Sequence, residues 1–343
     1  MNPPPKVIVA YTEYEPPAVN NGERMSEESL LEMARQVEAA IQTLGWPVTV
    51  VPLQRSILNF VNRLRSENPD VLVNLCEGFY GRSHWEANVA GVFELLGLSF
   101  TGNPPRTLAL CQDKFQAKAL LRAAGLPTAP AQLLTSPTQE TELSFPLIVK
   151  PDMEDASLGI YPQSVVRDGE GLAQQVQRIV ETYRQPAIVE KYIEGREFNV
   201  SVMDNGKIQP LPVSEIDFSE MPKGVPHICS YEAKWFEDHL LYQKTPPVCP
   251  AAIDEDLRQK LQELAAAAFR VMGCRDYARV DFRMSREGKI YILEVNPNPD
   301  ISLNAGYVRA LKAAGLRYEK FWRAMIENAL KRKDALDSTA DAK

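Results

Sequence analysis

The fold is decided by one stretch, Tyr277-Ala-Arg-Val-Asp-Phe-Arg-Met-Ser-Arg-Glu-Gly-Lys-Ile-Tyr-Ile-Leu-Glu-Val-Asn-Pro-Asn-Pro-Asp300, which predicts a β-hairpin. Two alternating runs, 278–284 and 289–295, flank a polar turn that contains Gly288, and glycine adopts the positive φ of such turns at little cost. Alternation then divides the side chains by face. One face of the first strand carries Arg279, Asp281 and Arg283, and one face of the second carries Ile290, Ile292, Glu294 and Asn296.

This hairpin also predicts a metal site. If Asp281 and Glu294 face each other, two carboxylates and the amide oxygen of Asn296 converge at one end. Hard oxygen ligands suit Mg²⁺ far better than Zn²⁺, and two facing carboxylates repel each other without a cation between them. These residues alone leave open an ordinary amphipathic hairpin with a solvated polar face.

Composition limits the class of protein. The chain has 343 residues, of which 45% are hydrophobic and 24% charged, enough for two or three globular domains. A net charge of −7 argues against nucleic-acid binding and favours small, metal-chelated anions as ligands. Five scattered cysteines without a CxxC pair, and only three histidines, exclude a zinc framework and give no disulfide pattern. No leader or membrane-length apolar run is seen, so we expect a cytoplasmic protein without membrane contact.

The N-terminal third alternates strands and helices. Strands are expected at 7–10, 48–53 and 71–75, and helices at 27–44, 57–65 and 85–96. This order predicts an α/β fold with a parallel sheet covered on both faces. Ligands of such sheets bind beyond the carboxyl ends of the strands, here after Tyr11 and Leu75. One helix, 107–124, should connect this domain to the next.

The remainder of the chain is expected to hold three further parts. An antiparallel meander with one helix (169–182) spans 130–216, and its clearest hairpin pairs 198–203 with 208–213 through Asp204-Asn205-Gly206. A long polar segment, 217–248, has no period and is therefore expected to be functional. Helices follow at 255–272, 305–314 and 318–330. The expected domains are 1–105, 106–216 and 217–333, with a disordered tail over 334–343.

The residues that carry charge occur in a recognisable order. Lys150 ends a strand and precedes a loop in which Ser157-Leu158-Gly159 could bind phosphates through backbone N–H groups, although a strand-end lysine on its own is a weak signal. Together with the hairpin, the arrangement resembles the ATP-grasp superfamily and, within it, the D-alanine–D-alanine ligase family over 71–330. The motifs that carry this resemblance are Phe100-Thr101-Gly102, Asp113-Lys114, Ile148-Val149-Lys150-Pro151, Tyr231-Glu232-Ala233-Lys234 and Leu293-Glu294-Val295-Asn296.

The resemblance implies a fold and a set of site residues. An N-terminal α/β domain precedes central and C-terminal domains that sandwich ATP, and the family suggests a homodimer. The implied ATP-binding residues are Lys114 and Lys150 (phosphates), Glu190, Lys191 and Ile193 (adenine), Glu197 (ribose) and Lys234 (γ-phosphate, on a lid loop). Asp281, Glu294 and Asn296 would hold two Mg²⁺ ions, for which Mn²⁺ could substitute. The implied catalytic residues are Arg279, Lys234 and Ser157.

These residue types suit one reaction. A carboxylate is a poor electrophile, and its phosphorylation by ATP gives an acyl phosphate that an amine attacks to form an amide, ADP and phosphate. The sequence therefore predicts an ATP-dependent carboxylate–amine ligase with two small-molecule substrates. An authentic D-alanine–D-alanine ligase and a non-catalytic ATP-binding regulatory protein are the alternatives.

The chain departs from the family pattern where substrates bind. Thr12 to Pro17 lacks the family's glutamate turn, Cys76 to His84 replaces a His-Gly segment, and Asn298-Pro299-Asp300-Ile301 replaces Ser-Pro-Gly-Met. Candidate substrate residues are Glu13, Glu15, Glu77, His84, Trp235, Asp300 and Asn304. Asp300 either repels the carboxylate of an incoming amino acid, which favours an amine with extra positive charge, or caps the following helix. His84 is a surface residue in the alternative interpretation.

Overall fold

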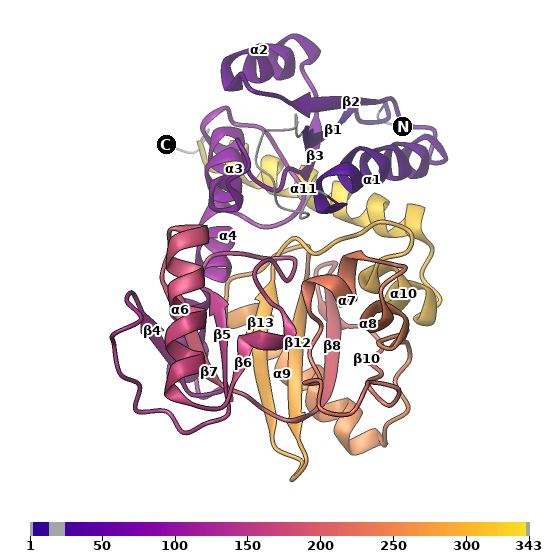
Figure 1. Cartoon of the computed structure of the whole chain (residues 1–343). Helices are drawn as coiled ribbons and strands as arrows, with labels where there is room; N and C mark the ends of the chain where they lie inside the picture. The colour runs from indigo at the N-terminus through magenta and orange to yellow at the C-terminus, as the bar shows by residue number, and fades with distance from the viewer. Residues whose placement is uncertain (1–2, 14–24, 341–343) are drawn as a thin grey trace.

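The computed structural model describes residues 3–13 and 25–340 and shows an N-terminal layer above two larger sheets (Figure 1). The N-terminal sheet has the order β2 (Val48–Leu53), β1 (Val7–Thr12), β3 (Val71–Leu75), and all its pairs are parallel, as predicted. α1 (Met25–Gln42) and the C-terminal helix α11 (Tyr318–Ala340) pack on one face. α2 (Ile57–Glu67) and α3 (Glu86–Leu95) cover the other.

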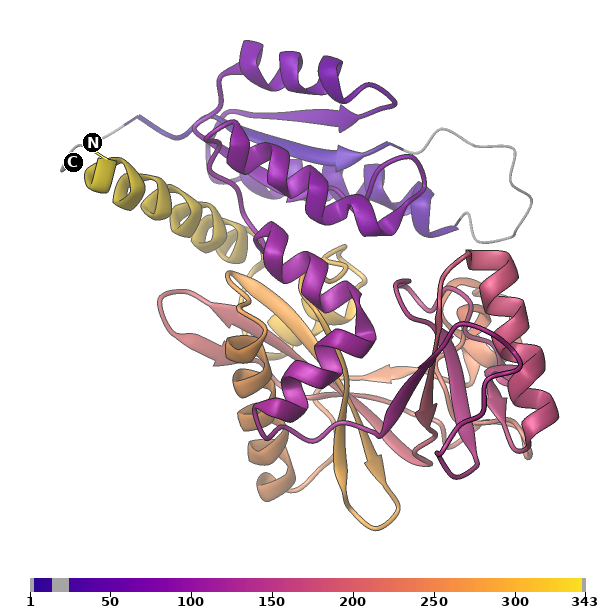
Figure 2. The same cartoon turned by 90° about the vertical axis from the view of Figure 1, so that its left-hand side faces the viewer.

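The connection out of this domain is two helices instead of the one predicted. α4 (Pro105–Gln112) ends and α5 (Lys114–Ala123) begins at Asp113, whose backbone leaves the helical region at ψ 94. The Asp113 carboxylate accepts the Gln116 N–H at 2.8 Å, so it caps the new helix. Figure 2 shows this purple connection running from the upper sheet to the lower part of the molecule. The break makes Lys114 the first residue of α5.

The strands expected to form one meander over 130–216 lie in two sheets, so that prediction is wrong. The four-stranded sheet has the order β4 (Ala131–Leu134), β7 (Ala187–Lys191), β5 (Leu147–Pro151), β6 (Val165–Val166), with α6 (Gly169–Tyr183) on one face. The six-stranded sheet contains β8 (Gly195–Asp204), β9 (Ile208–Pro210), β10 (Ser214–Ile216), β11 (Pro247–Val248), β12 (Tyr277–Ser285) and β13 (Ile290–Asn296). The Asn-Gly hairpin between β8 and β9 is confirmed.

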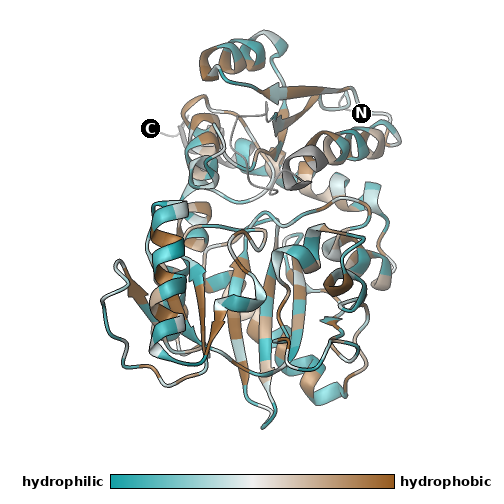
Figure 3. Cartoon of the chain, in the orientation of Figure 1, coloured by the Kyte–Doolittle hydropathy of each residue, from teal (hydrophilic) through white to brown (hydrophobic). Residues whose placement is uncertain are grey.

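The change of sheet, between Lys191 and Gly195, does not coincide with the proposed domain boundary at 216. α9 (Glu255–Val271) packs on the larger sheet, as its apolar stripe predicts. In Figure 3 the strands of the two lower sheets are largely hydrophobic, whereas α6 carries hydrophilic residues along much of its visible side. One face of each sheet is thus covered by a helix, α6 or α9.

The central hairpin contains a bulge that the sequence did not reveal. Asp281 lies opposite Glu294, as predicted, but Phe282 pairs with Ile292, so Leu293 is an extra residue on β13. The prediction that Ile290 and Ile292 share a face with Glu294 is therefore wrong. Ile292 is 0% exposed in the core. The extra residue exchanges the two faces of β13 at Leu293. Ile292, before the bulge, therefore points into the core, whereas Glu294 and Asn296, after it, point to the opposite side.

Two C-terminal segments also differ in detail from expectation. The polar segment 217–248 contains two short helices, α7 (Tyr231–Trp235) and α8 (Leu240–Gln243). α10 (Gly306–Ala313) follows the hairpin. A disordered tail was expected after Lys333, but the backbone continues α11 as far as Ala340. No Gly or Pro interrupts the helix over these residues. No helix in the described ranges, 3–13 and 25–340, is long and apolar enough to span a membrane.

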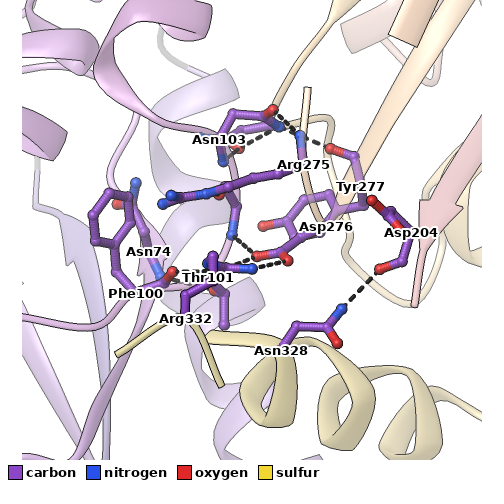
Figure 4. Close-up of polar contacts among 12 residues, drawn as sticks. Asn74, Phe100, Thr101, Asn103, Asp204, Arg275, Asp276, Tyr277, Asn328 and Arg332 are labelled. Carbon is purple, nitrogen blue, oxygen red and sulfur yellow. Dashed lines mark hydrogen bonds and ion pairs between the residues drawn. The ribbon is translucent and has the colours of Figure 1, made fainter. Parts of the chain in front are cut away.

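A buried polar junction joins α11 to the N-terminal domain and to β12 (Figure 4). Asp276, which is 1% exposed, accepts the Gly102 N–H at 2.8 Å and both Arg332 Nη atoms at 2.6 and 2.9 Å. Arg332 also donates to the Phe100 carbonyl, and Asn328 of α11 donates to the Asp204 carbonyl. The junction therefore fixes the upper domain relative to the hairpin.

We expect Arg332→Met to lower the free energy of unfolding by about 2 kcal/mol, because the buried Asp276 carboxylate loses its charged partner. Lys331→Met removes the same charge from an exposed neighbour and should cost less than about 0.5 kcal/mol. Urea denaturation of both variants measures the difference. Equal stabilities would contradict a structural role for this junction.

Candidate active site

A cavity of about 1240 Å³ lies between the two lower sheets and the N-terminal domain. The predicted site residues that line it are Glu77, Lys150, Ser157, Glu190, Lys191, Ile193, Glu197, Lys234, Trp235, Arg279, Asp281, Glu294, Asn296, Asp300 and Asn304. A volume of this size accommodates a nucleotide and further small molecules. Residues separated by more than two hundred positions in the sequence thus line one cavity.

At the wall of the cavity formed by β5 and β7, two lysines share one buried carboxylate. Lys150 Nζ lies 2.6 Å from Glu190 Oε1, and Lys118 Nζ lies 2.9 Å from Glu190 Oε2. Burial raises the pKa of Glu190, but Lys118 and Lys150 outweigh it and hold the pKa below its usual range. Burial lowers the pKa of Lys118, which is 1% exposed. Sequence reasoning missed Lys118, although its position one helical turn after Lys114 was a usable signal.

Lys114 does not line the cavity but supports the loop above it. Its ammonium group donates to the Glu154 carbonyl and lies 3.3 Å from Asp155 Oδ1. The next residues of this loop, Ala156 and Ser157, both adopt positive φ, at 56° and 62°. Two consecutive left-handed residues without glycine indicate a strained loop that surrounding contacts hold in place.

Those contacts come from the segment 217–248, which contains α7 and which we call the lid. The Trp235 indole N–H donates to the Ala156 carbonyl at 2.9 Å, and Ser157 Oγ donates to the Cys229 carbonyl at 3.0 Å. Lys234 Nζ lies 5.3 Å from the centroid of the Trp235 ring. The lid is thus in contact with the loop, and Ser157 holds the two together.

The hairpin carboxylates meet at the floor of the cavity. Arg279 Nε and Nη2 donate to Asp281 Oδ1 and Oδ2 at 2.7 and 2.8 Å, a bidentate pair. Burial raises the pKa of Glu294, but Lys114, Lys150 and Arg279 offset it and lower the pKa to about 2. Glu294 is therefore ionised at neutral pH and faces the lysines.

The donor set fits a hard divalent cation. Asp281 and Glu294 supply carboxylate oxygens from adjacent strands. Asn296 directs Nδ2 to both carboxylates, at 3.0 Å from Asp281 and 3.3 Å from Glu294, so its amide must rotate to offer Oδ1. The described part of the chain contains no cluster of three or more His, Cys, Asp or Glu suited to a metal. Two carboxylates completed by phosphates and water are what Mg²⁺ prefers.

The ribose and adenine candidates lie on neighbouring elements. Glu197 on β8 lines the cavity and pairs with Arg283 at 3.3 Å. Lys191 turns its ammonium group away, to the carbonyls of Ser144 and Phe145 at 2.9 and 2.8 Å. The Lys191 ammonium group is therefore not directed at a ligand in the cavity, and its backbone groups are what remain. This agrees with the expectation that backbone groups contact the edge of the adenine ring.

The far end of the cavity carries the residues that depart from the family pattern. Asp300 accepts the Ser302 N–H at 2.8 Å, and the N-cap of α10 is Ala305, so the prediction that Asp300 caps that helix is wrong. Burial raises the pKa of Glu86 to about 8, and the Asn298 amide, which donates to it at 2.8 Å, opposes the shift. Sequence reasoning missed Glu86 and Arg309, which also line this end.

Two predicted substrate residues, Glu13 and His84, do not line the cavity. Glu13 accepts hydrogen bonds from Tyr11 and Gln54. His84 is exposed, with its ring 5.9 Å from that of Trp85. Glu15 lies outside the described residues. Leu30 and Met33 of α1 line the cavity on this side.

The sequence was compared with known families and proteins. Residues 120–327 match the family described as D-ala D-ala ligase C-terminus. The chain is 33% identical to the uncharacterized protein y4sG of Sinorhizobium fredii over 88% of each chain. It is 31% identical to a D-alanine–D-alanine ligase of Alcanivorax borkumensis, covering 92% of this chain and 94% of that protein.

Solved structures show the same fold. A D-alanine–D-alanine ligase from Bacillus anthracis complexed with ATP superposes with a TM-score of 0.72 at 22% identity, covering 96% of this chain and 99% of that one. The corresponding enzyme from Coxiella burnetii gives a TM-score of 0.74 at 20% identity, covering 98% of this chain and 97% of that one. The chain has the ATP-grasp fold and belongs to the D-alanine–D-alanine ligase family.

Proposed function

We propose that this protein is an ATP-dependent carboxylate–amine ligase that works through an acyl phosphate. A carboxylate oxygen attacks the γ-phosphorus of ATP, and ADP leaves. The amine nitrogen then attacks the carboxyl carbon, the bond from that carbon to the phosphate oxygen breaks, and the amine loses its proton. The products are an amide, ADP and phosphate.

One observation carries the proposal: lysine side chains and a facing carboxylate pair converge on a single cavity. Lys150, Lys234 and the loop supported by Lys114 surround the proposed triphosphate position, with Glu190, Lys191 and Ile193 beside the base and Glu197 at the ribose. The first step brings two anions together, and fixed positive groups offset their repulsion. A protein that only bound ATP would not need all of these groups.

Asp281, Glu294 and Asn296 would hold Mg²⁺, and we propose two ions with Glu294 shared between them. Bound Mg²⁺ neutralises charge on the phosphates. Arg279, fixed by Asp281, lies where it can donate to the oxyanion that develops on the carboxyl group. The closed lid, with Ser157 and Trp235, keeps water from the acyl phosphate.

Removal of divalent metal should abolish turnover. With excess EDTA we expect phosphate release to fall at least about a hundredfold, and added Mg²⁺, or Mn²⁺ as a substitute, should restore it. ATP-dependent thermal stabilisation should fall in parallel, since the carboxylates and phosphates then repel each other. Unchanged phosphate release without metal would contradict the assignment of the hairpin residues.

The proposed function is tested by incubating the protein with ATP, Mg²⁺ and pairs of amino acids or other carboxylates and amines. ADP release that requires both substrates, with an amide product detected by mass spectrometry, supports a ligase. ATP binding without such turnover would favour a regulatory protein.

We also propose that the enzyme is cytoplasmic and homodimeric.

A second candidate is D-alanine–D-alanine ligase itself. Relatives that are 31% identical, from Alcanivorax borkumensis and Rhizobium meliloti, are named D-alanine–D-alanine ligases, which favours this activity. Formation of D-alanyl-D-alanine from D-alanine alone would establish this activity. The substituted residues at the far end of the cavity make it the second choice.

A further inference from the structure

The two lysines that share Glu190 differ in their access to the cavity. Lys150 and Glu190 line the cavity, whereas Lys118 is not among the residues that line it. Lys118 is 1% exposed and extends from α5 to the buried carboxylate. A ligand in the cavity can therefore contact Lys150 directly, but it cannot contact Lys118.

Each lysine contacts its own oxygen of the shared carboxylate. Lys118 Nζ lies 2.9 Å from Glu190 Oε2, and Lys150 Nζ lies 2.6 Å from Glu190 Oε1. Burial, and in addition the positive charge of Lys150, lower the pKa of Lys118, while Glu190 opposes the shift. The two ammonium groups thus compete for one carboxylate, so Glu190 holds Lys150 less strongly than it would in an isolated pair.

Lys150 also interacts with the carboxylate that we propose as a metal ligand. Burial raises the pKa of Glu294, but nearby positive side chains, Lys150 among them, lower it to about 2. Lys150 therefore acts on two carboxylates, Glu190 in the wall and Glu294 on the hairpin. The proposed function places the phosphates of ATP beside Glu294, within the influence of the same ammonium group.

Removing the charge of Lys118 would change this division. Glu190 is 1% exposed, and a carboxylate at such a position needs a positive partner in the protein interior. Without Lys118, Lys150 would be its one partner in this group of three side chains. Lys150 would then interact less strongly with an anion in the cavity.

Resting on the ATP site of the proposed function, we propose that Lys118 is a positioning residue for the phosphates of ATP. By sharing Glu190, Lys118 leaves Lys150 able to bind them. Lys118 contacts neither the nucleotide nor the two substrates and acts only through Glu190 and Lys150. Its effect should therefore fall on the phosphates and not on the adenosine part of ATP.

The test measures the dissociation constants of ATP with Mg²⁺ and of adenosine by titration calorimetry of the full chain. Their ratio follows the phosphate contacts, because adenosine has no phosphates and changes in binding of the base cancel. For Lys118→Met we expect the preference for ATP to fall about tenfold, the loss expected for one hydrogen bond from a charged group. Arg122→Met, an exposed change on the same helix, should leave it within about twofold of wild type.

Further variants separate positioning from a purely structural role. Lys118→Arg keeps the positive charge and should retain most of the preference for ATP. Adding Glu190→Gln to Lys118→Met removes the charge that holds Lys150, so most of the preference should return. Lys118→Gln keeps an N–H for Glu190 without the charge. It should lower the preference at least about threefold, and it serves in place of Lys118→Met if that variant does not fold.

An unchanged preference for ATP in the neutral Lys118 variants would overturn the inference, because Lys118 would then serve stability alone. A lowered preference that Glu190→Gln does not restore would overturn it as well. Both results would leave a ligase intact. The expected ratios together with ADP release that needs neither a carboxylate nor an amine would instead overturn the proposed function and leave the role of Lys118 in place.

Discussion

Replacing Glu294 with glutamine is expected to lower kcat about a thousandfold with little change in folding. The carboxylate is ionised at neutral pH, because Lys114, Lys150 and Arg279 outweigh the effect of burial. Glutamine keeps the shape and one oxygen but removes the charge that would hold Mg²⁺ against the phosphates. Single-turnover phosphate release at saturating ATP measures the effect.

Glu287→Gln is the matched control for this change. Glu287 lies in the exposed turn of the same hairpin, so its substitution removes an equal charge from the same element. We expect its kcat to stay within about twofold of wild type. Full turnover by Glu294→Gln would remove the metal assignment from the hairpin.

The buried lysine–carboxylate group gives the second large effect, on stability. Glu190→Ala should lower the free energy of unfolding by about 3–5 kcal/mol, because Lys118 and Lys150 lose the carboxylate that they share in the protein interior. The midpoint of urea denaturation measures this change. Glu181→Ala, on the exposed side of α6, should cost less than about 0.5 kcal/mol.

A double variant distinguishes an unpaired charge from lost packing. Lys118→Met combined with Glu190→Leu removes both members of the most buried pair and fills their volume with apolar groups. It should regain part of the stability lost in Glu190→Ala, because Lys118, the more buried of the two lysines, is no longer left without a partner, whereas Lys150 still is. If the double variant were as unstable as the single one, packing around β7 and not charge would explain the loss.

Local sequence patterns were sufficient for much of the fold. Strand and helix alternation predicted the parallel sheet of β1, β2 and β3, and the Gly288 turn predicted the hairpin that pairs Asp281 with Glu294. These features depend on periodicity over a few residues. The predicted site residues on the hairpin accordingly line the cavity.

Features that depend on distant contacts were not predictable in this way. β8 pairs with β12, so the strands that were expected to form one meander lie in two sheets. The Leu293 bulge is visible only in the register of two strands, and it decides which side chains reach the cavity. Glu86 comes to the cavity through packing of the N-terminal domain against the loop after β13, where the Asn298 amide donates to it. Pattern alone carries no information on such packing.

The same limit explains the missed lysine. Lys118 belongs to the site because α5 restarts at Asp113 and turns one face toward Glu190. In a single helix continuous from residue 107, the side chain of Lys118 would point in another direction. A capping aspartate within an otherwise helical pattern is the signal that could have revealed this break.

The acyl-phosphate reaction is tested most directly by following carboxylate oxygen. The protein is incubated with ATP, Mg²⁺, an amine and a carboxylate labelled with oxygen-18, and the released phosphate is examined by mass spectrometry. Because the carboxylate oxygen that attacks ATP leaves with the phosphate, one labelled oxygen should appear in each phosphate formed with the amide. Phosphate without label, or ADP release that does not depend on the carboxylate, would contradict the proposed ligase mechanism.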